Sequence, residues 1–113
     1  MGSEESGWYA VRCVFRLAGT GQGNFYEERV TLWQASSAEV AIARAEADAA
    51  EYANVIEEAP HAYLGLAQSF HLFDQPADGA EVFSLLREST LLPRDYLDAF
   101  FDTGTEYQRS VGD

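Results

Sequence analysis

The sequence contains a single cysteine and no lysine. With Cys13 as its only thiol, the chain of 113 residues cannot form an intramolecular disulfide or a thiolate metal site of its own. All seven basic residues are arginines, and nineteen acidic residues give the chain a net charge of −12. Binding to the phosphate backbone of nucleic acids depends on clustered cations. We therefore expect no nucleic-acid partner.

Long apolar runs and targeting signals are also missing. No stretch approaches the roughly 20 apolar residues that a membrane-spanning helix requires. Residues 1–7 are acidic, whereas a secretion signal is basic and apolar. The sequence therefore predicts a cytoplasmic protein with no membrane partner, and residues 1–7 are expected to be flexible.

Signatures of metal and cofactor binding are absent as well. Three glycines lie between residues 18 and 24, but they lack the Gly-Lys-Ser/Thr sequence of a phosphate-binding loop and precede a strand instead of a helix. Asp74 and Asp78 lack the further oxygen ligands of a calcium loop, so a turn is the simpler interpretation. We expect no cofactor, no metal site and no catalytic residue, which leaves an enzymatic function unsupported.

Apolar residues are abundant enough for one folded domain. Hydrophobic residues form 47% of the chain and aromatic residues 13%, which is enough to offset the conformational entropy lost on folding. The length fits one core. We expect a single domain over residues 8–102, followed by a mobile tail at residues 103–113.

Residues 8–17 show the two-residue alternation of a half-buried strand. One set is wholly apolar and is expected to face the core: Tyr9, Val11, Cys13, Phe15 and Leu17. The other set mixes aromatic, small and cationic side chains and should face outward: Trp8, Ala10, Arg12, Val14 and Arg16. Cys13 is therefore predicted to be a buried free thiol.

A second strand is predicted at residues 25–35, where aromatic and β-branched residues recur. It should pair with the first strand as an antiparallel hairpin. We expect Tyr26, Val30 and Leu32 to face the core. The alternate residues should then share the outer face: Glu27, Arg29, Thr31 and Trp33.

The next segment has the signals of an amphipathic helix. Ser36 and Glu39 match a capping box, and Pro60 should end the helix. Alanines dominate the predicted buried stripe, which lets the helix approach a sheet closely. The stripe consists of Ala38, Ala41, Ile42, Ala45, Ala49, Tyr52, Ala53 and Ile56.

A third strand is predicted at residues 62–73. The side chains of Tyr63 and His71 should face outward from it. A turn then leads to a fourth strand at residues 81–87, in which the alternation does not assign Arg87 to a face. The core side of the third strand is expected to carry Leu64, Leu66, Phe70 and Leu72.

A second helix is expected to begin near Pro93 and to pack on the core. The order of elements is then ββαββα, which predicts an α+β fold with a four-stranded antiparallel sheet and both helices packed on one face. The repeated ββα order is compatible with an internal duplication. The apolar stripe of the second helix consists of Tyr96, Leu97, Phe100 and Phe101.

Six segments of the chain share a family pattern. They lie at residues 8–11, 26–30, 35–41, 63–65, 81–84 and 96–101. Together they resemble the bacterial family described as domain of unknown function 4288. The resemblance implies a small cytoplasmic bacterial protein and no particular reaction. Leu92 stands before Pro93 where family members often have serine, which removes a capping hydroxyl.

The predicted outer face combines cations and aromatic rings in an otherwise acidic protein. Trp, Tyr and Arg dominate binding hot spots, and the planar arginine fork recognises carboxylates. The alternative is structural, in which the rings cover the sheet and the arginines neutralise Glu27 and Glu28. We predict a partner-binding or ligand-binding surface made of Trp8, Arg12, Arg16, Arg29, Trp33, Tyr63 and His71.

Two classes of function fit this surface. The first is a protein-interaction module that binds another protein or a second copy of itself, and a homodimer joined through the sheet is its simplest form. An immunity or inhibitor protein against a basic partner is a related version, since an acidic helix surface would steer such a partner. The second class is a protein that binds a small anionic ligand, or an enzyme, and that uses His71 with Arg12 or Arg16.

Overall fold

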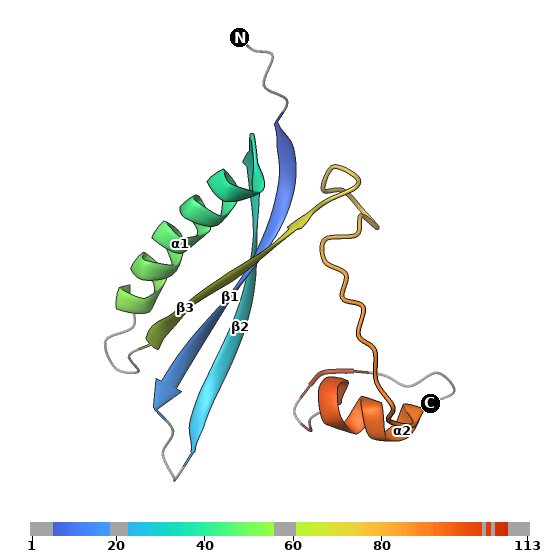
Figure 1. Cartoon of the computed structure of the whole chain (residues 1–113). Helices are drawn as coiled ribbons and strands as arrows, with labels where there is room; N and C mark the ends of the chain where they lie inside the picture. The colour runs from blue at the N-terminus through green and yellow to red at the C-terminus, as the bar shows by residue number, and fades with distance from the viewer. Residues whose placement is uncertain (1–5, 19–22, 56–60, 103, 105, 109–113) are drawn as a thin grey trace.

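The protein is a three-stranded antiparallel sheet with one long helix packed on one face (Figure 1). In chain order its elements are β1 (Gly7–Ala18), β2 (Asn24–Ala35), α1 (Ala38–Val55), β3 (His61–His71), α2 (Pro93–Tyr96) and the π-helical turn η1 (Leu97–Phe101). The computed structural model describes residues 6–18, 23–55, 61–102, 104 and 106–108. The expectations for Ile56, for Pro60 and for most of the two chain ends fall outside these residues.

β1 is the central strand, and the strand order is β2-β1-β3. Phe15 lies opposite Glu27 of β2 and opposite Tyr63 of β3. Directly opposed residues of antiparallel strands point to the same face of the sheet. We call the face that α1 covers the helix face and the other the outer face.

The core lies between the helix face and α1. Cys13 and the other buried β1 residues meet a stripe of small side chains on α1, which lets the helix backbone approach the sheet. This confirms four of the five predicted core residues of the first strand, and it confirms the alanine stripe within the described part of the helix, whereas Leu17 is only half-buried. The buried residues of this core are Tyr9, Val11, Cys13 and Phe15 from β1, Ala35 from β2, and Ala41, Ala45 and Ala49 from α1.

The N-terminus of α1 is capped one residue later than the sequence predicts. The hydroxyl of Ser37 accepts a hydrogen bond from the Val40 N–H at 3.2 Å, and its carbonyl accepts one from the Ala41 N–H at 3.1 Å. Ser37 is therefore the N-cap in place of Ser36.

The predicted faces of the second and third strands are wrong. Arg29, Trp33 and Tyr63 point toward α1, whereas Tyr26 and Val30 are exposed on the outer face. The prediction followed the more apolar set of each strand. The pairing register with β1 determines which side chains of these strands face α1. Charged residues are tolerated on that face because α1 supplies polar partners for them.

β3 contains an irregularity at its midpoint. Cys13 lies opposite Ala67 and Phe15 lies opposite Tyr63, so a step of two residues along β1 spans four residues along β3. Gly65 lies within this bulge with φ of +83°, in the left-handed region that glycine adopts without strain. The bulge keeps Tyr63 and Ala67 on the same face.

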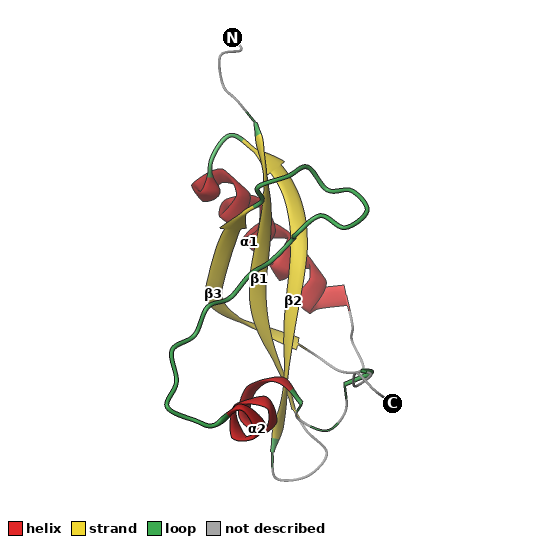
Figure 2. Ribbon diagram, turned by 90° about the vertical axis from the view of Figure 1, so that its right-hand side faces the viewer, coloured by secondary structure: helices red, strands yellow, loops and turns green. Residues whose placement is uncertain are grey.

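Residues 81–87 do not form the predicted fourth strand. They have no regular secondary structure and pair with no strand in the described part of the chain. They belong to residues 73–102, which we call the C-terminal arm and which Figure 2 shows crossing the outer face of the sheet. The ring of Phe83 lies 6.0 Å from that of Phe70 on β3. The segment thus covers the sheet face instead of extending its edge.

The second helix does not pack on the core as predicted. Figure 1 shows α2 on the opposite side of the sheet from α1, and within the described residues α2 and η1 pack on each other and on no strand. Because α1 already fills the helix face, Leu97, Phe100 and Phe101 remain exposed. The ββαββα architecture with a four-stranded sheet and both helices on one face is therefore wrong. The fold has three strands, and the arm lies on the outer side.

Candidate functional site

The seven residues predicted to form one binding surface lie on two faces of the sheet. The sheet itself separates the two groups, so the predicted surface does not form as one site. Trp8, Arg12 and Arg16 lie on the outer face. Arg29, Trp33, Tyr63 and His71 lie on the helix face.

Arg29 joins β2 to α1. Its Nη1 atom lies 2.9 Å from Oδ2 of Asp48, and its guanidinium carbon lies 4.1 Å from the centre of the Tyr52 ring. Both side chains of the ion pair are about one third exposed, at 33% and 37%. These contacts occupy the Arg29 fork, so this arginine orients the helix on the sheet instead of presenting a charge to a partner.

Trp33 also belongs to the junction between β2 and α1. Its Nε1–H donates to the hydroxyl of Thr31 at 2.7 Å, and the guanidinium of Arg44 lies 5.1 Å from the ring centre. Arg44 in turn donates to the carbonyl of Gln34 at 2.8 Å. The indole therefore packs beneath the helix and is not part of the outer face.

Tyr63 forms a hydrogen bond across the core. Its hydroxyl donates to Oε2 of Glu46 at 2.5 Å. Burial and this hydrogen bond raise the pKa of Tyr63 far above its ordinary value. Burial likewise raises the pKa of the neighbouring Cys13 thiol. Cys13 is thus held as a neutral, buried thiol, in agreement with its predicted structural role.

Tyr52, Glu27 and His61 form a polar cluster on the helix face. The hydroxyl of Tyr52 lies 2.8 Å and 3.1 Å from the two carboxylate oxygens of Glu27, and Nε2 of His61 lies 3.6 Å from Glu27 Oε1. The hydrogen bond to Glu27 raises the pKa of Tyr52. Phe15 packs against the Tyr52 ring at 5.1 Å. Sequence patterning missed this cluster because it assigned Glu27 to the outer face, although the pairing of Glu27 with Phe15 would have revealed it.

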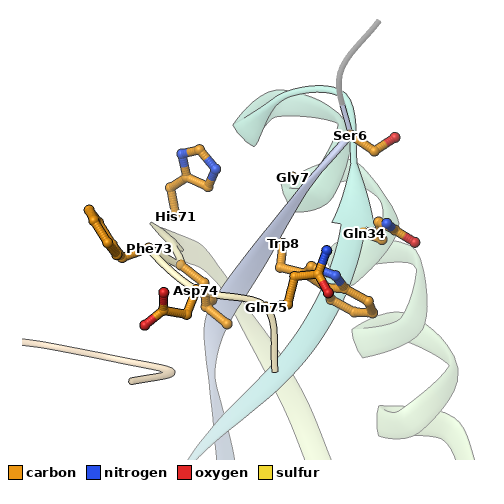
Figure 3. A pocket seen from close by; sticks show the side chains of 9 residues that line it. Ser6, Gly7, Trp8, Gln34, His71, Phe73, Asp74 and Gln75 are labelled. Carbon is orange, nitrogen blue, oxygen red and sulfur yellow. The ribbon is translucent and has the colours of Figure 1, made fainter. Parts of the chain in front are cut away.

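His71 and Trp8 line a shallow pocket of about 190 Å³ at one end of the sheet (Figure 3). The two side chains point away from each other in Figure 3, because they belong to different faces. The His71 ring stacks on Tyr9 with centroids 4.6 Å apart, and a Cβ atom at Gly7 would lie 2.7 Å from its Nε2 atom. Arg12 and Arg16 do not line this pocket. The predicted set of His71 with either arginine is therefore not assembled.

Arg12 is the predicted site residue with the richest surroundings on the outer face. Its Nη2–H donates to Oε1 of Gln68 at 2.7 Å, and its Nη1 atom lies 3.6 Å from Oε1 of Glu28. Its guanidinium carbon also lies 4.9 Å from the centre of the Phe83 ring. Arg12 thus links all three strands of the sheet to the C-terminal arm. Arg16 is exposed nearby on the same strand.

A cavity of about 570 Å³ opens between the outer face and the arm. Arg87 enters it from the arm, donates to the hydroxyl of Tyr96 at 2.9 Å and lies 4.2 Å from the centre of the Phe100 ring. Sequence patterning left the direction of Arg87 open, because a segment that crosses a sheet face has no periodicity that reveals its contacts. The lining residues are Arg12, Glu28, Leu85, Arg87, Tyr96, Ala99, Phe100 and Phe101.

Two features of the described residues bear on the class of protein. No group of three or more His, Cys, Asp and Glu side chains among them is arranged to hold a metal ion. None of their helices combines the length and the apolar character needed to cross a membrane.

Comparison with known proteins gives one match. A family model for a domain of unknown function, DUF4288, matches residues 8–84, which include β1, β2, α1, β3 and the Phe83 contact. Neither the curated proteins nor the solved structures contain a match to the chain. The segment at residues 96–101 lies beyond the matched region. Because the family model covers more than half of the chain, the protein belongs to the DUF4288 family.

Proposed function

We propose that this protein is a self-associating module in which the outer sheet face and the C-terminal arm of one copy bind those of a second copy. The observation that carries the proposal is the amount of exposed apolar surface on these two parts. On β2, Tyr26 is 62% exposed. On the arm, Leu86 is 98% and Leu92 is 71% exposed. Exposed apolar surface is typical of protein interaction sites where it forms a patch, and we propose that these side chains form one together with those of the second copy.

The charges of the two parts are complementary. The arm carries seven carboxylates and two arginines, a net charge of −5. The outer face of the sheet carries Arg12 and Arg16 against Glu28 and is therefore net positive. An acidic arm from one copy would lie favourably on the basic outer face of the other.

A second copy fits these features better than an unrelated protein. Each chain carries both the acidic arm and the basic face, so a two-fold arrangement uses each complementary pair twice. The proposed contact uses the exposed side chains of β2, at Tyr26, Val30 and Leu32, and the outward side chains of the arm. A different partner, such as a basic protein held by an inhibitor, would leave the isolated chain monomeric.

The proposal is tested by measuring the molar mass of purified protein by light scattering during size exclusion at micromolar concentrations. We expect the wild type to elute as a dimer of twice 12.5 kDa. Tyr26→Asp and Leu86→Asp should each weaken the dimer by at least about tenfold, because each places a charge where burial of a large side chain would contribute about 1.5–3 kcal/mol.

Val55→Asp is the matched control. Val55 is 72% exposed, but it ends α1 on the other side of the sheet. The same substitution there should leave the dimer intact. A monomeric wild type, or equal weakening by all three substitutions, would contradict self-association through the outer face and the arm.

A further inference from the structure

The cavity beneath the C-terminal arm has the size and composition of a ligand site. Its volume of about 570 Å³ falls within the range of roughly 300–1,000 Å³ that is typical of small-molecule pockets. One wall is the outer face of the sheet, with Arg12 and Glu28, and the other wall is the arm. Because the two walls come from segments distant in sequence, a bound molecule would connect the arm to the sheet.

Arg87 supplies a positive charge that the described residues do not neutralise. Its guanidinium contacts the Tyr96 hydroxyl and the faces of the Tyr96 and Phe100 rings. The ion pairs among the described residues involve Arg12, Arg29 and His61, and none involves Arg87. An arginine stacked on aromatic rings keeps its planar fork oriented for a carboxylate.

The net charge of the lining selects the charge of the ligand. Arg12 and Arg87 contribute two positive charges and Glu28 contributes one negative charge. Glu28 lies 3.6 Å from Arg12, so the two charges partly cancel on the sheet wall. One positive charge in excess suits a monoanion, whereas Glu28 would repel the second charge of a dianion.

The remaining lining is apolar and largely aromatic. Leu85, Ala99, Phe100 and Phe101 come from the arm, and the last two rings are 47% and 65% exposed. Such surface gains free energy when an apolar group covers it. The ligand should therefore carry an apolar body next to its charged group.

We infer that this cavity binds a monocarboxylate with an aromatic or alkyl body, its carboxylate held by Arg87, its body packed on the rings of the arm, and Arg12 adding positive charge on the sheet wall. The inference rests on the lining of the cavity and not on self-association. The cavity shares Arg12 and Glu28 with the outer face proposed to bind a second copy, whereas Arg87 lines the cavity from the arm. His71, which the sequence suggested as a partner of Arg12, takes no part in it.

The test is isothermal titration calorimetry with 3-phenylpropanoate and octanoate, each compared with its neutral amide. We expect both carboxylates to bind the full chain at millimolar concentration or below, and the amides to bind at least about tenfold more weakly, since they lack the charge-assisted hydrogen bonds. Arg87→Met should weaken the binding of both carboxylates by a similar factor. Arg87→Lys, which keeps the charge but not the fork, should give an intermediate affinity.

Arg94→Met is the control, because Arg94 is an exposed arginine of the same arm that does not line the cavity. Circular dichroism of each variant shows whether α1 is intact, and repeating the titration with Tyr26→Asp separates binding from association. No binding by wild type, equal binding of acid and amide, or equal losses in Arg87→Met and Arg94→Met would each overturn the inference.

Discussion

Tyr63 shows that a single partner across the core can decide the role of a residue. Its position in an alternating strand is equally compatible with either face, and its aromatic character suggested a binding surface. The hydrogen bond to Glu46 of α1 places it in the core instead. Arg29 likewise faces the helix, because it forms an ion pair with Asp48 of α1. Arg12 was placed correctly because β1 is the one strand whose two sets differ clearly in polarity.

Tyr63→Phe should lower the free energy of unfolding by about 1 kcal/mol, the usual net value of a hydrogen bond within a protein. The substitution removes the bond to Glu46 and keeps the ring. Tyr26→Phe, at an exposed tyrosine of the outer face, should leave stability unchanged. Urea unfolding followed by circular dichroism measures both. Equal effects of the two substitutions would show that the Glu46 contact contributes nothing.

Stability should fall as the pH rises above 10. The folded state raises the pKa of Tyr63 above the ordinary value of 10.0, chiefly through burial and also through the hydrogen bond to Glu46. It raises the pKa of Tyr52 chiefly through the hydrogen bond to Glu27. A group with a raised pKa stabilises the folded state fully below its unfolded pKa and progressively less above it. Urea midpoints measured at neutral pH and above pH 10 test this. Tyr63→Phe should show a smaller fall than wild type, and an identical fall would refute the assignment to Tyr63.

At the scale of elements, local patterns predicted the three strands of the sheet and its long helix. The alternation of β1 and the alanine stripe of α1 are strong signals of secondary structure, because each separates apolar from polar residues. The faces of β2 and β3 could not be predicted, since α1 provides the partners that tolerate Glu27 and Arg29 in the junction. The prediction of a fourth strand was wrong for a related reason. Residues 81–87 have strand-like composition, but Phe83 packs on Phe70 of the sheet face, and the segment pairs with none of the strands that the structure describes.

The bulge in β3 depends on glycine at one position. Gly65→Ala should lower the free energy of unfolding by about 1 kcal/mol or more, because an alanine is strained at φ of +83°. Apart from Gly65 and its two chain neighbours, no described residue has an atom within 4 Å of the position that the Cβ would occupy, so the effect is one of backbone conformation. Gly23→Ala is the control, since that site has equal space and no positive φ. Equal effects at both glycines would contradict a special backbone role for Gly65.

At the scale of the whole molecule, the protein divides into a packed half and an open half. The helix face is covered by α1, and Arg29, Tyr52 and Tyr63 on the two sides of this interface each have a polar partner. The outer face carries the arm, a cavity and large exposed side chains. The radius of gyration is 17.0 Å, whereas a compact chain of 113 residues has about 13 Å. The proposed second copy and the proposed carboxylate would each cover part of this open side.

Part of this surface could be predicted from the sequence. The separation of Arg12 and Arg16 from the acidic remainder of the chain indicated the outer face, and that location holds for both residues. The participation of the arm could not be predicted, because no local periodicity indicates that Phe83 contacts Arg12 or that Arg87 lines the same cavity as Arg12.

Sedimentation equilibrium of the wild-type protein over a range of micromolar concentrations tests self-association most directly. The proposal predicts that the weight-average mass rises with concentration from 12.5 kDa toward twice that value, and that sodium chloride weakens the association, because an acidic arm lies on a basic face. A constant mass of 12.5 kDa at every concentration would contradict the proposal.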